Sequence, residues 1–155
     1  MKIIKSARHS RIAGDFGENL VLYLLSKHGY ECATLDHVGI DLIARRPRSG
    51  EVMGISLKTR TRFPGTESSA LNIPLDNLTK ASRACKSFGL KPYFAVVVDG
   101  VQNIRVLLMP MTSLKRHSAK GKSVLRWQMG RKDLEKYSRD KSIQHFVLVH
   151  ETKAK

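Results

Sequence analysis

Three short segments of the chain carry polar residues whose order is suited to hydrolytic chemistry. Glu18 lies in the segment GDFGENLV, Asp41 in GIDLIA and Lys58 in ISLKTR. Taken singly, each has an ordinary explanation, as a solvated helix flank, a turn residue or an exposed strand end. Taken together, they predict a carboxylate and an ammonium group side by side at one end of a buried sheet, where desolvating both charges is costly. A structural ion pair and a metal-dependent hydrolytic site are two explanations of this arrangement.

Hydrophobic periodicity predicts the elements that position these residues. Apolar residues recur at helical spacing over residues 12–28, and Glu18 lies at the border of that apolar stripe. Asp41 opens a predicted strand that ends at residue 45. A second strand is predicted over residues 52–60, because its residues alternate, and the alternation places Lys58 on the same face as the serine two residues before it.

The remaining chain predicts one α/β domain over residues 1–155. The further elements expected are strands over 30–35, 93–98, 104–109, 124–129 and 143–149, a helix over 75–88, a basic loop or short helix over 112–122 and a helical turn over 134–137. A helix between the third strand and the run YFAVVV indicates that these two strands pair in parallel. We therefore expect a core over about residues 12–98, with a mixed sheet flanked by helices, and a β-rich extension over about 103–150.

The order of elements and the three polar segments resemble the PD-(D/E)XK superfamily of nucleases, also called restriction-endonuclease-like, which includes archaeal Holliday-junction resolvases. The resemblance covers roughly residues 12–98 and implies an αβββαβ core. It implies that Glu18, Asp41 and Lys58 are catalytic. Asp41 would bind a divalent cation, Mg²⁺ or Mn²⁺, with Glu18 as a second carboxylate, and Lys58 would position the attacking water. The implied protein is a metal-dependent endonuclease that hydrolyses DNA and forms a homodimer to cut two strands.

Ser56 departs from the superfamily pattern, which has Asp, Glu or less often Gln at that place. A neutral hydroxyl binds a hard cation more weakly than a carboxylate does. Glu18, Glu51 and Glu67 are candidates to supply the missing charge, and the sequence does not choose among them. Ser56 therefore motivates an alternative function, a nucleic-acid-binding protein with the same fold and impaired catalysis.

The charge of the chain favours a polyanionic partner. Lys and Arg number 28 and Asp and Glu 13, so the formal net charge is +15. A field of this sign attracts nucleic acid, and DNA is the expected partner. A basic protein that docks on an acidic protein is a third hypothesis. The candidate nucleic-acid contacts are Arg45, Arg60, Arg62, Lys80 and Arg83.

Several other classes of protein are disfavoured by the sequence. No apolar run approaches the roughly 18 residues of a membrane span, and the basic N-terminus lacks the apolar stretch of a secretory signal. The two cysteines form no CxxC motif, and the six histidines show no metal-ligand spacing. We therefore expect a cytoplasmic protein without a disulfide framework or a cysteine-based metal site.

Overall fold

Residues 2–150 are described by a computed structural model of the chain. The two ends of the predicted domain, Met1 and residues 151–155, lie outside the described residues. The elements in chain order are α1 (His9–Lys27), β1 (Glu31–His37), β2 (Ile40–Arg45), β3 (Val52–Thr61), β4 (Leu71–Pro74), α2 (Leu75–Phe88), β5 (Lys91–Asp99), β6 (Asn103–Pro110), α3 (Met111–His117), β7 (Ala119–Lys120), β8 (Val124–Trp127), α4 (Arg131–Arg139) and β9 (Gln144–Val149).

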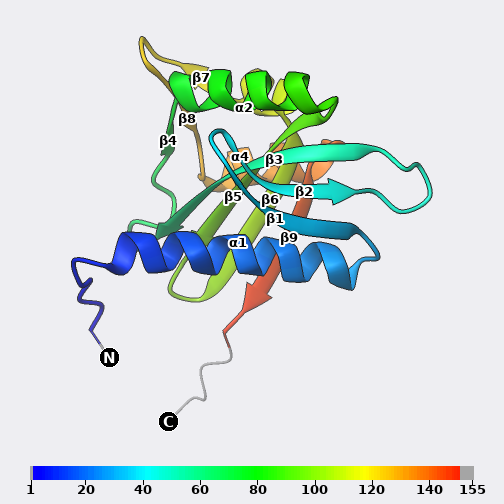
Figure 1. Cartoon of the computed structure of the whole chain (residues 1–155). Coiled ribbons are helices and arrows are strands. Elements are labelled where there is room, and N and C mark those ends of the chain that lie inside the picture. The colour runs from blue at the N-terminus through cyan, green and yellow to red at the C-terminus, as the bar shows by residue number, and fades with distance from the viewer. Residues whose placement is uncertain (1, 151–155) are drawn as a thin grey trace.

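A six-stranded sheet with the order β1-β2-β3-β5-β6-β9 forms the centre of the fold (Figure 1). β3 and β5 pair in parallel, with Ser56 opposite Phe94 and Lys58 opposite Val96. The other neighbouring strands of this sheet pair antiparallel. The predicted mixed sheet and its parallel pair are therefore confirmed, and α2 is the helix that makes the crossover between β3 and β5.

Each face of the sheet is covered by its own set of elements. The helix α1 crosses one face, where Val21 and Leu25 pack with Leu42 and Ile55 in one hydrophobic cluster. On the other face, α2, α3, α4 and the small sheet β4-β8-β7 enclose a second cluster, which includes the buried Trp127. The two helices α1 and α2 thus lie on opposite faces of the same strands (Figure 1).

The structure adds elements that periodicity did not predict. The strand β4 occupies Leu71–Pro74 and pairs with β8, and β7 spans only Ala119–Lys120. Strands this short contain too few residues for an alternating pattern to be recognised. The predicted turn over 134–137 is a full helix, α4, and the basic segment after Pro110 begins with the helix α3. None of the helices in residues 2–150 is both long enough and apolar enough to cross a membrane.

Candidate functional site

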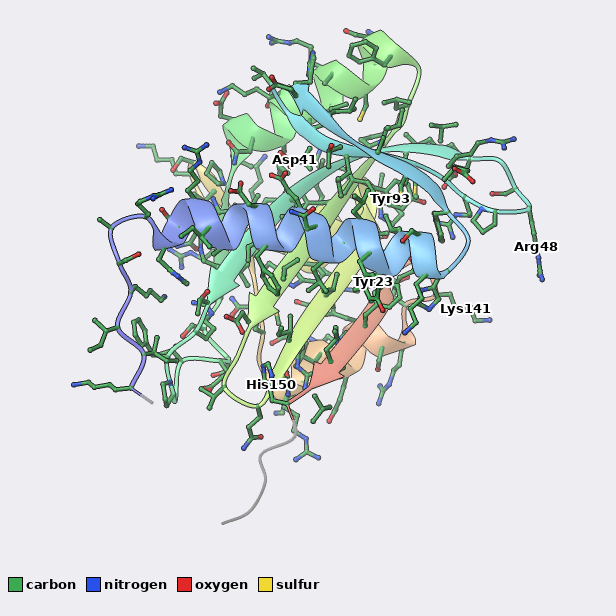
Figure 2. The ribbon with its side chains drawn as sticks, turned by 60° about the horizontal axis from the view of Figure 1, so that its bottom comes forward. Tyr23, Asp41, Arg48, Tyr93, Lys141 and His150 are labelled. Atoms are coloured by element: carbon green, nitrogen blue, oxygen red, sulfur yellow. The ribbon has the colours of Figure 1, made fainter. Side chains whose placement is uncertain are left out.

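Asp41 lies at the end of β2 where its pairing with β3 stops. The paired residues run as far as Leu42 and Ile55. Just beyond them, Asp41 Oδ2 accepts a hydrogen bond of 2.7 Å from the main-chain N–H of Leu57. Burial raises the pKa of Asp41, and the hydrogen bond from Leu57 opposes that rise because it stabilises the charged form. The carboxylate is therefore fixed against β3 in a half-buried setting (Figure 2).

Glu18 is brought to this region by a close contact between α1 and β3. The preceding residue, Gly17, is buried, and a Cβ added to it would overlap the Thr59 hydroxyl. Only a residue without a side chain lets the helix approach the strand this closely. The pKa of Glu18 is raised first by burial, then by the negative charge of Asp41 and then by that of Asp15. The carboxylates of Glu18 and Asp41 therefore lie within electrostatic range of each other.

Ser56 and Lys58 lie on the face of β3 turned toward α2. A Cβ added at Gly54, two residues before Ser56, would lie 2.6 Å from the Cys85 sulfur of α2, and strand alternation places the next two even-numbered residues on that side. Ser56 is buried and Lys58 is half-buried. The pKa of Lys58 is lowered first by burial and then by the charge of Arg60. Lys58 is thus a partly desolvated ammonium group on β3, one residue after Leu57, whose N–H binds Asp41.

The two carboxylates of the site have no cationic partner in the part of the chain that the structure describes. Neither Glu18 nor Asp41 forms a salt bridge there, although the chain contains 28 Lys and Arg residues. Glu51, in contrast, contacts both Arg46 and Lys91. The structural ion pair considered from the sequence is therefore not formed at Asp41. Two neighbouring carboxylates left without a counter-charge are suited to a bound cation.

The donor set fits Mg²⁺ only as an open site. Among residues 2–150, no three His, Cys, Asp or Glu side chains are grouped as a metal site. However, Mg²⁺ is usually held by one or two carboxylates, with waters and substrate phosphates as the remaining ligands. Glu18 and the second oxygen of Asp41, which accepts no hydrogen bond from the described residues, meet that requirement. These two residues are therefore the candidate ligands for a divalent cation.

The other two acidic candidates lie away from this site. Glu51 is five residues before Ser56, roughly 16 Å along an extended strand. Its carboxylate accepts hydrogen bonds from Lys91 Nζ at 2.7 Å and Tyr93 Oη at 2.8 Å. Glu67 lies beyond the carboxyl ends of β3 and β5, where its Cγ would be 3.5 Å from a Cβ added at Gly100. Neither carboxylate takes the place that Ser56 leaves vacant.

Two of the predicted nucleic-acid contacts continue along β3 beyond the site. Arg60 is exposed, and its charge contributes to the lowered pKa of Lys58. Arg62 is half-buried and donates hydrogen bonds to the carbonyl oxygens of Ser69 at 2.7 Å and Ala70 at 3.2 Å. Arg60 is thus available to a ligand near Lys58, whereas Arg62 orders the loop that follows β3.

The other three predicted contacts are more widely spread. Arg45 is exposed at the opposite end of β2 from the site. On α2, Lys80 forms an ion pair of 2.6 Å with Asp76, and Arg83 is exposed without one in the described residues. The turn before β2 lies against α2, because a Cβ added at Gly39 would be 2.6 Å from the Lys80 main chain. The middle of α2 therefore adjoins the turn that leads into the site.

One contact near the site was not predicted from the sequence. The segment before α1 lies along the end of β3, where Lys5 Nζ donates a 2.7 Å hydrogen bond to the Thr61 carbonyl oxygen. His9 Nε2 is 2.9 Å from Thr61 Oγ1, and Lys5 Nζ also lies 4.3 Å from the centre of the Phe63 ring. The sequence indicated only that this segment is basic. Its position depends on contacts between residues far apart in the chain, which no local pattern encodes.

Comparison with known proteins supports the predicted fold. No protein-family model matches the chain, and no curated protein matches it in sequence. A solved structure does match: Hjc, a Holliday junction resolvase of the archaeal hyperthermophile Archaeoglobus fulgidus, at 16% identity and a TM-score of 0.56. The match covers 74% of this chain and 83% of Hjc, which is a member of the PD-(D/E)XK superfamily.

The chain therefore has a restriction-endonuclease-like α/β fold, with a central mixed sheet flanked by helices. This confirms at the level of fold the resemblance predicted from the three polar segments. The roles of Glu18, Asp41 and Lys58 are not tested by this similarity and stay predictions.

Proposed function

We propose that this chain is a divalent-metal-dependent endonuclease that hydrolyses DNA phosphodiester bonds, with Glu18, Asp41 and Lys58 as its catalytic residues. The observation that carries the proposal is the pair of carboxylates on α1 and β2, which lie within electrostatic range of each other and lack a cationic partner among the described residues. The half-buried Lys58 adds an ammonium group on β3, the strand that pairs with β2. A net charge of +15 supports a polyanionic substrate.

Each proposed residue has a role that its surroundings support. A bound divalent cation would supply charge stabilisation at the phosphate and lower the pKa of a water molecule. Asp41 holds one carboxylate oxygen toward that position, because its other oxygen is fixed by the Leu57 N–H. Glu18 provides the second carboxylate from the helix. Lys58, which is partly desolvated, stabilises negative charge that develops on the phosphate during hydrolysis.

The substrate is proposed to lie along the basic residues around β3 and α2. Arg60 continues the strand beyond Lys58, and Arg83 extends the positive charge onto α2. The similarity to a Holliday junction resolvase makes a four-way DNA junction the first substrate to test. Since one chain contains one proposed site, we expect a homodimer to cut two strands, and sedimentation of the complex measures this. We place this activity in the cytoplasm.

A second function is favoured by one observation, the serine at position 56. If the missing carboxylate prevents catalysis, the chain binds DNA and does not cut it. Binding of this kind weakens steeply with salt, because each phosphate contact releases counterions. The two functions share a substrate and differ only in whether product forms.

Cleavage of a labelled four-way junction, a linear duplex and a single strand, with Mg²⁺, Mn²⁺ or a chelator, tests the primary proposal. Asp41→Asn and Lys58→Met are expected to reduce cleavage at least about 100-fold, in line with the loss of a charge-stabilising group. Matched controls are Glu31→Gln, opposite Arg45 at the far end of β2 from Asp41, and Lys141→Met, both exposed.

The outcome separates the two functions. Metal-dependent cleavage that is lost in Asp41→Asn and retained in both controls supports the nuclease. Salt-dependent binding with no product under any metal supports the binding protein. Cleavage that survives Asp41→Asn contradicts the proposed site.

A further inference from the structure

Ser56 occupies the position at which the resemblance to the PD-(D/E)XK superfamily implies a further carboxylate. Continuing the β2–β3 pairing by one residue beyond Leu42 and Ile55 places Ser56 opposite Asp41. Ser56 is only 8% exposed and shares its strand face with Lys58. A carboxylate here would lie between the Asp41 main chain and the lysine, but the chain has a small neutral hydroxyl.

No other described carboxylate replaces the missing charge. Glu51, which Lys91 contacts, and Glu67, which lies near Gly100, are at opposite ends of the sheet. Asp15 is exposed on α1, one turn before Glu18, and acts on the site only as a further negative charge. The candidate ligands for a cation are therefore two carboxylates, those of Glu18 and Asp41. One oxygen of Asp41 already accepts a hydrogen bond from the Leu57 N–H.

Two carboxylates in a strongly cationic protein are a weak site for a divalent cation. The overall charge of +15 repels cations, and Mg²⁺ and Mn²⁺ prefer six oxygen ligands. Lys58, on the same face as Ser56, adds local positive charge. A DNA phosphate provides what the protein lacks, an anionic oxygen ligand, and it also neutralises part of the surrounding positive field.

We propose that Ser56 makes cation binding at this site depend on the DNA phosphate, so that the cation binds weakly to the free protein and much more tightly to the protein–DNA complex. This inference rests on the proposed function, because it places the phosphate beside Glu18 and Asp41. By linkage, the cation strengthens DNA binding by the same factor as DNA strengthens cation binding. A coupling of about 10- to 100-fold is expected, within the range of ordinary coupling between binding sites.

Binding measurements on the full-length chain test this inference without relying on turnover. Electron paramagnetic resonance of free Mn²⁺ gives cation binding with and without a four-way DNA junction. Fluorescence anisotropy gives junction affinity at increasing Mn²⁺ and constant ionic strength. Gel analysis of each sample verifies that the DNA is intact. The junction without protein measures the Mn²⁺ that DNA binds by itself.

Three variants make the expected results specific. Ser56→Glu is expected to raise the Mn²⁺ affinity of the free protein about tenfold or more and to reduce its enhancement by DNA. Ser56→Ala, which is similar in size and also neutral, is expected to keep the wild-type coupling. Asp41→Asn is expected to abolish it. If Ser56→Glu does not fold, the wild type, Ser56→Ala and Asp41→Asn still decide the question.

Two results overturn the inference. One is Mn²⁺ binding to the free wild-type protein that DNA does not strengthen, and the other is an enhancement by DNA that Asp41→Asn retains. Failure of the proposed function is distinct from either result. Coupling between Mn²⁺ and DNA binding without cleavage contradicts the proposed nuclease activity and supports the inference about Ser56. Cleavage with Mn²⁺ binding that does not depend on DNA supports the nuclease activity and contradicts the inference.

Discussion

Gly17 of α1 lies directly against the side chain of Thr59 of β3, with no room for a Cβ between them. This contact sets the distance between the helix that carries Glu18 and the strand that carries Lys58. Protein interiors are packed closely enough that a single added methyl group is felt. The geometry of the candidate site therefore depends on a residue that has no chemistry of its own.

Gly17→Ala is predicted to destabilise the protein by about 1–3 kcal/mol, because overpacking forces α1 away from β3. Gly14 lies in the same helix, and a Cβ added there would meet nothing within 4 Å. Gly14→Ala is therefore the matched control, and it should stabilise the helix by up to about 1 kcal/mol. Urea unfolding measures both variants, and cleavage should fall only in Gly17→Ala.

Thr59→Ala tests whether the overlap with the Thr59 hydroxyl causes the predicted loss of stability in Gly17→Ala. The Thr59 hydroxyl is buried without a hydrogen-bond partner among the described residues, so its removal leaves no described donor or acceptor unsatisfied. The double variant Gly17→Ala, Thr59→Ala is expected to recover most of the lost stability. If it is no more stable than Gly17→Ala, the contact between these two residues is not the cause.

Asp41→Asn is predicted to leave the stability of the free protein unchanged or to raise it by about 0.5–2 kcal/mol at neutral pH, while abolishing cleavage. Burial raises the pKa of Asp41, so the folded state disfavours its charged form. That cost is present at neutral pH and disappears as the pH falls through the raised pKa. Asparagine can still accept the hydrogen bond from Leu57.

Thermal unfolding over a range of pH measures this effect. The difference in Tm between Asp41→Asn and the wild type should shrink as the pH is lowered, whereas Asp36→Asn, on the exposed side of β1, should show little difference at any pH. A variant that unfolds far more easily than the wild type at neutral pH would indicate that Asp41 has a structural role.

Arg60→Ala is predicted to weaken DNA binding and to reduce the slope of log affinity against log salt by about 1, as expected for one lost phosphate contact. Arg48 is the matched control, because it is exposed at the turn between β2 and β3, well away from Asp41 (Figure 2). Fluorescence anisotropy over a series of salt concentrations measures both variants. Equal effects of the two substitutions would mean that binding depends on total charge rather than on the surface beside β3.

Asp140→Asn is predicted to destabilise the protein by about 1–3 kcal/mol at neutral pH. Asp140 accepts hydrogen bonds from the Ser142 hydroxyl at 2.7 Å, from His117 Nε2 at 2.8 Å and from the Ser142 N–H at 2.9 Å, and it forms an ion pair with Arg116. These contacts, the Ser142 hydroxyl first, hold the pKa of Asp140 well below its ordinary value. The lowered pKa means that this stabilisation is present above the ordinary Asp value and is lost as the pH falls through the folded value.

Urea unfolding at neutral and acidic pH tests the role of Asp140. The variant and the wild type should converge in stability as the pH falls below the ordinary Asp value. Asp76→Asn, which removes an exposed ion pair with Lys80, should cost less than about 1 kcal/mol. An Asp140→Asn protein as stable as Asp76→Asn would contradict the prediction.

The sequence was sufficient for the parts of the fold that depend on local periodicity. Alternation over β3 correctly placed Ser56 and Lys58 on one face, and the helix α2 between β3 and β5 indicated their parallel pairing. The predicted strand pattern also placed Asp41 at the start of β2, beside β3. These features follow from short-range patterns and from rules of strand connection.

The direction of side chains could not be predicted in the same way. Asp41 and Lys58 were expected side by side as a possible ion pair, but Asp41 turns to the Leu57 N–H and Lys58 lies on the face toward α2. The contact of Lys5 with Thr61 joins residues 56 positions apart. Rotamers and long-range contacts are set by packing in three dimensions, which periodicity in one dimension does not record.

The parallel pairing of β3 with β5 also determines the order in which the domain can fold. The hairpin of β2 and β3 closes through a short turn, but β5 reaches β3 only after β4 and α2 have been traversed. Closing a longer loop costs more chain entropy, and non-local strand pairs form more slowly than local ones. A partly folded chain can therefore contain the β2–β3 hairpin with Asp41 while the other side of β3 still has no paired strand. The strand β3, which carries Lys58, is paired with both β2 and β5 only when the crossover is complete. The candidate site therefore forms only when the whole domain has folded.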